Sequence, residues 1–261
     1  MINILYEDNH LLAVLKPAGM ATMGLPEGEE TLLTLAKEYI KRKYNKSGEV
    51  YLGVVSRLDI PVSGIVLFAR TSKAAARLNE QFRNHTVEKI YLAIVEGKIF
   101  PDELELVGNI SLDKRHRKVK LTCGNNDNHD NKNGNDGKES KLRYRKLEQL
   151  GANSLIEVKL LTGRKHQIRV QLAAHGFPIL GDIKYGGKRR NMINNNNRNE
   201  KSNNDYFTLQ KNNGGRIALH AYKLSVNHPI TGNRITFETP QPLLLRELPQ
   251  ILSICQNKRT R

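Results

Sequence analysis

The sequence predicts an α+β fold built around a central mixed or antiparallel β-sheet. Short apolar runs rich in β-branched residues recur along the chain, and a few helical patterns interrupt them in an irregular order. The chain has 261 residues, of which 38% are hydrophobic, and this is enough for one large domain with a substantial core. We therefore expect residues 1–261 to form a single α+β domain.

The expected elements follow from apolar spacing and from turn residues. Apolar spacing with a period near 3.6 predicts a helix over 31–44, a second helix that Thr71 or Ser72 caps, and a short third helix over 165–175. A turn signal at 229–233 predicts a hairpin between the last two strands. The expected strands are, in chain order, 2–6, 11–15, the two runs that flank Asp59, 89–97, 142–147, 154–161, 224–227 and 234–238.

Two stretches, 124–140 and 188–215, interrupt this pattern. Both are dense in Asn, Gly, Lys and Asp and contain few apolar residues. Such segments bury too little surface to offset the entropy of ordering, so we interpret both as flexible surface insertions.

The charge of the chain indicates a polyanionic partner. Lys and Arg outnumber Asp and Glu by 42 to 26, which gives a formal net charge of +16. This excess is spread along the chain and favours nucleic acid over a membrane surface, with a merely basic soluble protein as the alternative. The two cysteines, Cys123 and Cys255, lie far apart and lack the spacing of a zinc site or a disulfide framework. With no secretory signal and no apolar run of membrane-spanning length, we expect a cytoplasmic protein.

The first candidate for chemistry is the loop between the apolar runs at 54–55 and 65–69. It carries Arg57 and Asp59, followed by Pro61, Ser63 and Gly64, which impose an unusual backbone geometry. A charge beside buried strands must be paired or functional. Taken alone, a local ion pair between Arg57 and Asp59 would be the simpler interpretation.

The second candidate is the basic and polar cluster at 162–172, which follows a strand and opens the short third helix. It contains Arg164, Lys165, His166 and Arg169, and a Gly-rich turn at a helix start with nearby cations suits a phosphate. The alternative is a set of surface charges on an amphipathic helix, with His166 a satisfied structural histidine.

The two clusters together favour a catalytic carboxylate. An Arg on the helix start could meet Asp59 across the sheet as a buried pair and keep the carboxylate ionised. An ionised, oriented carboxylate suits a nucleophile or base at a sugar carbon. Only one carboxylate stands out, whereas ordinary glycosidases use two, so simple hydrolysis is not our first choice.

These residues resemble the catalytic motif of the RluA-like pseudouridine synthases, usually written HRLDxxTSG, through Arg57-Leu58-Asp59 and Ser63-Gly64. Other segments match the same family in the same order. They are 16–19 (KPAG), 88–93 (EKIYLA), 162–169, 181–186 (GDIKYG) and 219–221 (LHA). The resemblance covers nearly the whole chain apart from the two insertions, and the family's frequent N-terminal S4 domain is not expected here.

The resemblance implies roles for individual residues. Asp59 would act at C1′ or C2′ of a target uridine, and the sequence leaves open which. Arg169 would pair with Asp59, Tyr91 would stack on the extruded base and assist proton removal at C5, Leu219 would line the base pocket, and Arg57 would help displace the nucleotide. The implied activity is isomerisation of uridine to pseudouridine in rRNA or tRNA by a monomer that needs no metal or cofactor.

The loop departs from the family pattern at three positions. Ser56 replaces the usual His, Ile60 a basic residue, and Val62 the usual Thr. These changes retain the carboxylate, but they are the support for an alternative, a catalytically inactive RNA-binding protein with the same fold. A nucleosidase that releases free base is a further alternative, although the sequence offers no evident group to activate water.

Overall fold

The computed structural model of the chain describes residues 2–26, 28–113, 118–122, 137–187 and 215–240. The described residues form one mixed sheet of eleven strands, with α-helices and a short 3-10 helix, so the α+β prediction is confirmed. The strands are β1 (Asn3–Glu7), β2 (Leu11–Lys16), β3 (Gly53–Val54), β4 (Ser63–Ala69), β5 (Glu88–Glu96), β6 (Glu103–Asp113), β7 (Lys118–Thr122), β8 (Lys138–Leu150), β9 (Asn153–Leu160), β10 (Leu219–Asn227) and β11 (Arg234–Glu238). The helices are α1 (Leu32–Lys43), α2 (Ser72–Arg83), α3 (Gln167–Ala174) and the 3-10 helix η1 (Ile183–Tyr185).

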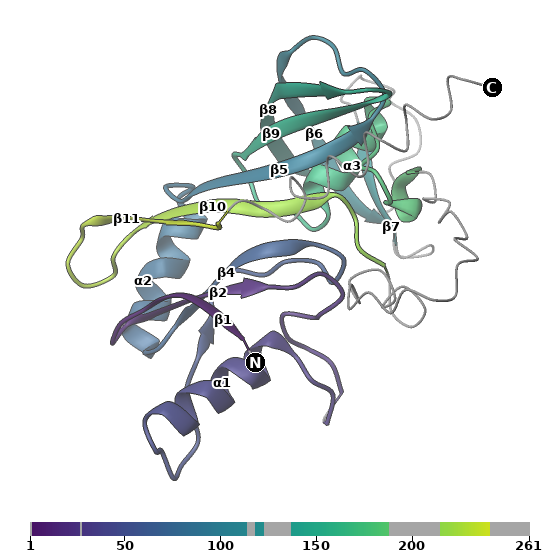
Figure 1. Ribbon diagram of the computed structural model, residues 1–261. Coiled ribbons are helices and arrows are strands. Elements are labelled where there is room, and N and C mark those ends of the chain that lie inside the picture. Colours follow the sequence, from purple (N-terminus) through teal and green to yellow (C-terminus); the bar gives the residue numbers. More distant parts are fainter. Residues whose placement is uncertain (1, 27, 114–117, 123–136, 188–214, 241–261) are drawn as a thin grey trace, which may run out of the picture.

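Strand β10 joins two halves of the molecule. The sheet runs in the order β1-β2-β4-β10-β5-β9-β8-β6-β7, with β3 beside β4 and β11 beside β10. Figure 1 shows β10 crossing between a lower half, with β1, β2, β4, α1 and α2, and an upper half, with β5, β6, β8, β9 and α3. The pairing of β4 with β10 is parallel, whereas the other strand pairs of the described sheet are antiparallel.

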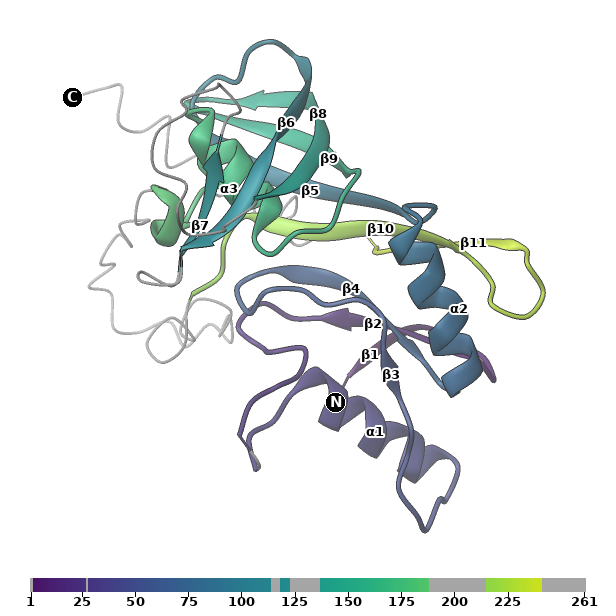
Figure 2. The same cartoon turned by 180° about the vertical axis from the view of Figure 1, so that it is seen from behind.

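In the lower half, α1 and α2 cover opposite faces of β4 (Figure 2). Because side chains alternate along a strand, Val66 and Phe68 pack with α1, whereas Ile65 and Leu67 pack with α2. The side chain of Thr71 accepts the backbone N–H of Ala74 and so caps α2, as the sequence predicted. In the upper half, apolar residues of α3 pack in one core with β5, β6, β8 and β9.

Gly64 allows β4 and β10 to approach each other. Its φ is +125°, and a Cβ placed on it would lie 2.3 Å from the backbone oxygen of Ala221. Next to it, the Ser63 hydroxyl shares a 2.8 Å hydrogen bond with Nδ1 of His220, whose Nε2 lies 3.0 Å from the hydroxyl of Thr239. The Ser-Gly pair after the Asp59 loop therefore closes the junction between the two halves.

We predict that Gly64→Ala lowers the free energy of unfolding by roughly 3 kcal/mol or more, because the new methyl meets backbone at a positive φ. Gly48→Ala is the control, since a Cβ there has nothing within 4 Å, and its effect should stay within about 0.5 kcal/mol. Urea denaturation measures both. Equal free energies of unfolding for Gly64→Ala and Gly48→Ala would contradict the close approach of β4 to β10 at Gly64.

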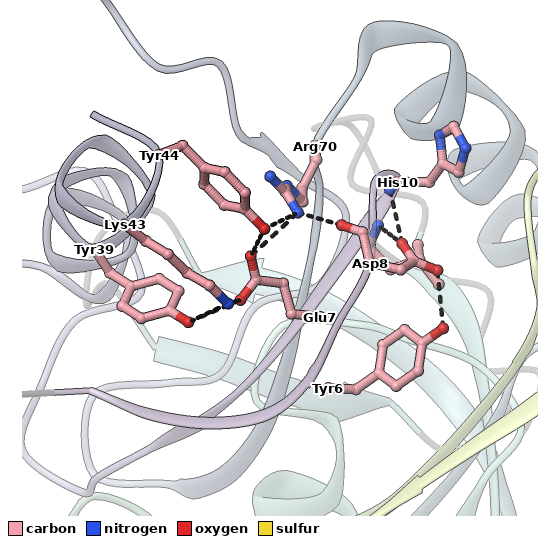
Figure 3. Close-up of polar contacts among 9 residues, drawn as sticks. Tyr6, Glu7, Asp8, His10, Tyr39, Lys43, Tyr44 and Arg70 are labelled. Carbon is pink, nitrogen blue, oxygen red and sulfur yellow. Dashed lines mark hydrogen bonds and ion pairs between the residues drawn. The ribbon is translucent and has the colours of Figure 1, made fainter. Parts of the chain in front are cut away.

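Glu7, at the end of β1, ties α1 to β4 (Figure 3). Its carboxylate, 8% exposed, accepts hydrogen bonds from Tyr39 Oη (2.8 Å), Lys43 Nζ (2.7 Å), Tyr44 Oη (2.7 Å) and Arg70 Nη1 (3.2 Å). Burial acts to raise the pKa of Glu7, but the hydrogen bonds from Lys43 and the two tyrosines outweigh it and lower this pKa. The ionised carboxylate is therefore the form that stabilises the fold.

Glu7→Gln should lower the free energy of unfolding by roughly 2 kcal/mol near neutral pH, because four donors lose a charged acceptor. A lowered folded-state pKa gives stability that is present above the unfolded value of about 4.3 and is lost as the pH falls through the folded value. The difference in the free energy of unfolding between wild type and Glu7→Gln should therefore become smaller as the pH falls. Glu38→Gln, which breaks an exposed pair with Arg42, should cost about 0.5 kcal/mol or less at any pH. A pH-independent gap for Glu7→Gln would contradict this assignment.

The structure corrects several predicted boundaries. Residues 138–140, predicted as the end of the first insertion, begin β8 and pair with β6, as in Ser140 with Gly108. The sequence prediction assigned no strands to 103–113 and 118–122, which form β6 and β7. Apart from 137–140 and Gly215, the two predicted insertions lie outside the described residues. Of the helices that the structure describes, none has the length and apolarity needed to cross a bilayer.

Candidate active site

The loop that carries Asp59 is held through its backbone. Lys16, fully buried at the end of β2, donates from Nζ to the carbonyl of Ile60 at 3.2 Å, and the N–H of Gly19 donates to the same oxygen at 2.7 Å. The hydroxyl of Thr22 bonds both the carbonyl and the N–H of Leu58. Burial lowers the pKa of Lys16 to about 7, against the opposing influence of Asp59. The first segment of the resemblance, 16–19, thus braces this loop.

Arg169, on α3, reaches Asp59 across 110 residues of sequence. Its Nη1 lies 3.0 Å from Oδ2 of Asp59, so the expected pairing is present. Arg169 also donates from Nε and Nη2 to the two oxygens of Asp182, at 2.6 and 2.9 Å. The side chains of Arg169 and Asp182 are 6% and 2% exposed, whereas that of Asp59 is 28% exposed. The fully buried ion pair is therefore Arg169–Asp182, and the prediction of a buried Asp59–Arg169 pair was wrong in this respect.

Sequence reasoning gave Asp182 no role, although it lies in the segment 181–186 that supports the resemblance. An Asp directly after a glycine, as in Gly181-Asp182, has the composition of a turn, and its partner is 13 residues away. The buried pair also affects Arg169. Burial acts to lower the pKa of the guanidinium, but its hydrogen bonds to the carboxylate of Asp182 outweigh this and raise the pKa. Only the contact with Arg169 reveals what Asp182 does.

Tyr91 and Leu219 lie on the neighbouring strands β5 and β10. Leu219 pairs with Ala93, and Tyr91 pairs with Ala221, so the two side chains belong to the same stretch of sheet. Leu219 is 3% exposed and belongs to the core of the upper half, against which Tyr91 also packs. Burial, with a smaller contribution from the charge of Asp59, raises the pKa of the Tyr91 phenol.

A cavity of about 80 Å³ brings the predicted site residues together. Besides apolar side chains and Gln167, it is lined by Arg57, Asp59, Tyr91, Arg164, His166, Arg169 and Leu219. A larger cleft of about 1900 Å³ adjoins the same residues and includes Lys165, which does not line the small cavity. Cationic side chains line much of this cleft, among them Arg57, Arg83, Lys89, Arg164, Lys165, Lys184 and Lys223. The smaller cavity has room for a small chemical group, and the cationic lining of the cleft suits an extended polyanion.

The start of α3 is less open to a phosphate than the sequence suggested. The backbone N–H of Arg164 donates to Oε1 of Gln167 at 3.0 Å, and the Arg164 guanidinium donates to the carbonyl of Glu139 at 3.0 Å. His166 occupies the N-cap position in the left-handed region, with φ +55°. Lys165 is exposed. The N–H of Arg164 is therefore already bonded, whereas Lys165 is a cationic side chain of the cleft that can meet a phosphate.

The three departures from the family motif have local explanations. The hydroxyl of Ser56 accepts the N–H of Leu67 at 2.8 Å and so links the loop to β4. Val62 is 3% exposed and packs in the core of the upper half, and Ile60 is 36% exposed at the cleft. Among the described residues, the hydrogen bonds and ion pairs of the Asp59 and Arg169 side chains involve none of these three side chains.

Comparisons with known proteins identify the family to which this chain belongs. Residues 10–174 match the model of the RNA pseudouridylate synthase family, so the chain belongs to this family, and its relatives are those of the RluA-like branch. The chain is therefore an isomerase that acts on RNA.

Two curated relatives illustrate the match. Ribosomal large subunit pseudouridine synthase D of Xanthomonas campestris pv. campestris is 34% identical, over 96% of this chain and 69% of the relative. The uncharacterised RNA pseudouridine synthase YhcT of Bacillus subtilis is 33% identical, over 95% of this chain and 71% of the relative. Among solved structures, human RNA pseudouridylate synthase domain containing 4 superposes with a TM-score of 0.71 over 96% of this chain and 93% of that chain, at 21% identity. This likeness confirms the fold.

We predict that Asp182→Asn lowers the free energy of unfolding by roughly 3 kcal/mol, because it leaves the buried Arg169 without its main counter-charge. Glu105→Gln is the control, since it removes the partner of the exposed Arg143 and should cost about 1 kcal/mol or less. Denaturant unfolding measures both. A loss for Asp182→Asn no larger than that of the control would contradict the buried pair.

Proposed function

We propose that this protein converts a uridine of ribosomal RNA to pseudouridine, with Asp59 as the catalytic residue. The observation that carries the proposal is Asp59, held 3.0 Å from Arg169, in the wall of a small cavity that opens beside a cationic cleft. The names of several relatives, ribosomal large subunit pseudouridine synthases, support rRNA over tRNA as the substrate.

The target uridine is turned out of its stack into the cavity, because chemistry on a base inside a helix is sterically blocked. The uracil lies between Tyr91 and Leu219, and the RNA backbone follows the cations of the cleft, including Arg164 and Lys165. Arg57, exposed at the rim, occupies the space that the base leaves. Protein groups on both halves of the molecule thus hold one extruded nucleotide.

Asp59 acts as an ionised carboxylate, either as the nucleophile at C1′ or as the base at C2′. In both courses the C1′–N1 bond breaks and its electron pair stays on uracil, which then turns in the cavity. In the nucleophilic course Asp59 forms an ester bond to C1′ as uracil leaves, and this ester bond breaks when C5 bonds to C1′, which returns the free carboxylate. In the C2′ course Asp59 takes the C2′ proton as uracil leaves, and C2′ regains this proton when C5 bonds to C1′. The C5 proton then leaves, and N1 is protonated. Substrate and product have the same composition, so the isomerisation consumes no co-reactant, and we propose that a monomer carries it out in the cytoplasm, where ribosomal RNA is available.

Tyr91 enters the reaction as a neutral phenol, because its raised pKa disfavours the phenolate. One cause of that raised pKa is the charge of Asp59, and this charge disappears once Asp59 has bonded to the ribose or accepted its proton. Loss of that charge lowers the pKa of Tyr91, so the phenol can pass its proton to N1 of the detached uracil, and the resulting phenolate can accept the C5 proton.

Asp59→Asn should reduce pseudouridine formation by about a thousandfold or more while RNA affinity stays within about threefold. The measurement is carbodiimide mapping of pseudouridine in rRNA and tRNA transcripts of the host cell, together with filter binding. Asp102→Asn is the control, because its carboxylate is 71% exposed in a loop away from the cleft and should leave activity unchanged.

Each alternative predicts a different outcome of this experiment. Full activity of Asp59→Asn would overturn the role of Asp59, and pseudouridine found only in tRNA would overturn the substrate. RNA binding without pseudouridine in the wild type would favour the inactive RNA-binding protein. Release of free uracil would favour the nucleosidase.

A further inference from the structure

The two oxygens of Asp59 have different surroundings. Arg169 Nη1 lies 3.0 Å from Oδ2, and His166 Nε2 lies 3.6 Å from the same oxygen. From the described residues, Oδ1 receives no hydrogen bond, although the side chain as a whole is 28% exposed beside the cleft. One oxygen is therefore turned toward protein donors, and the other is available to a bound nucleotide.

Arg169 alone does not hold the carboxylate in one orientation. Its Nε and Nη2 are occupied by Asp182, so Nη1 makes a single contact with Asp59. One hydrogen bond to one oxygen leaves rotation about the Cβ–Cγ bond of Asp59 open. A second donor directed at the same oxygen would restrict that rotation.

His166 is placed to be this donor. His166 is the N-cap residue of α3, and its backbone adopts the left-handed conformation, which is uncommon for a residue other than glycine. Its Nδ1 lies 2.6 Å from the hydroxyl of Tyr185, and the two rings meet edge-on. The Tyr185 ring also lies against the guanidinium of Arg169, with 5.0 Å from Cζ to the ring centroid. His166 and Arg169 thus share Tyr185 as a support.

The hydrogen bond to Tyr185 determines which nitrogen of His166 carries the proton. A phenol O–H is a stronger donor than an imidazole N–H, and an imidazole nitrogen is a stronger acceptor than a phenol oxygen, so the hydrogen of Tyr185 is directed to Nδ1 of His166. Burial lowers the pKa of His166 to about 4, against the opposing influence of Asp59, so the ring is neutral. A neutral ring that accepts at Nδ1 carries its proton on Nε2, the nitrogen that faces Asp59.

We propose that His166 is a positioning residue whose Nε2–H, together with Arg169 Nη1, anchors Oδ2 of Asp59, so that Oδ1 is the oxygen that bonds to C1′ or takes the C2′ proton. Tyr185 fixes the tautomer that makes this possible. The 3.6 Å separation is longer than a hydrogen bond, and we expect it to shorten when RNA fills the cavity. This inference rests on the proposed function, in which Asp59 is the catalytic residue.

Three variants test the proposal in steady-state assays with saturating rRNA. His166→Asn keeps a residue that tolerates positive φ but lacks Nε2, and kcat should fall about 10- to 100-fold with RNA affinity within about twofold. His166→Gln returns an amide N–H near the Nε2 position and should recover part of that loss. Tyr185→Phe should lower kcat about tenfold in the wild-type background and have no further effect in His166→Asn.

A spectroscopic measurement separates positioning from a general loss of structure. Nitrogen-15 NMR of the histidine rings should show His166 as the Nε2–H tautomer in the wild type and a shift toward Nδ1–H in Tyr185→Phe. His175→Asn, at the end of α3 and bonded to its own helix, is the control and should leave kcat unchanged. Thermal melting checks the folding of each variant. If His166→Asn does not fold, the NMR spectra and the activity of Tyr185→Phe still test the role of His166.

Three results would overturn the inference. They are a kcat of folded His166→Asn within about twofold of wild type, an effect of Tyr185→Phe that is equally large in both backgrounds, and an Nδ1–H tautomer in the wild type. If Asp59→Asn is inactive in the same assays, these results defeat only the role of His166. If Asp59→Asn is active, the proposed function fails with it.

Discussion

The guanidinium of Arg169 has to satisfy two carboxylates at once, and the arrangement of the site follows from this. A buried charge without a partner is strongly destabilising, so the position of Arg169 depends on Asp182, which takes two of its nitrogens. The remaining nitrogen, Nη1, is fixed in position by this pairing and donates to Asp59. The turn that carries Asp182 and the loop that carries Asp59 are thereby set relative to the same helix, α3.

The loop side of the site is fixed by backbone contacts. Lys16 and Gly19 hold the carbonyl of Ile60, and Gly64 brings β4 against β10 immediately after the loop. Asp59 therefore belongs to the lower half of the molecule and Arg169 to the upper half, and the cleft lies between them. An RNA strand in this cleft would contact both halves.

Burial shifts several ionisable groups at or beside the cleft toward their neutral forms. It lowers the pKa of Lys16 to about 7, of Lys89 to about 8, and of His166 to about 4. His166 is therefore neutral near pH 7, whereas Lys89 stays mainly protonated and contributes to the positive charge of the cleft. Together with the left-handed backbone of His166, these shifts indicate a region whose residues are arranged for chemistry at some expense of stability.

Much of the fold could be predicted from periodicity and caps. The helices α1 and α2, the β10–β11 hairpin and the strands around Asp59 each carry their signal within a few residues. The prediction missed β6 and β7, although Leu104 and Leu106 in β6 and Val119 and Leu121 in β7 alternate with polar residues as expected for strands. It also began β8 too late, because Lys138 and Glu139 are both polar and exposed, and periodicity does not separate such a strand end from a polar loop.

For the site, the sequence by itself determined which residue types are present and pointed to Asp59 and Arg169 as partners. The tertiary structure alone decided that Asp182 is the buried partner of Arg169, that His166 and Arg169 face the same oxygen of Asp59, and that Tyr185 supports His166. The physical reason is that a hydrogen bond acts over about 3 Å whatever the separation in sequence. Only the order of strands in the sheet brings residues 59, 169 and 182 within that range.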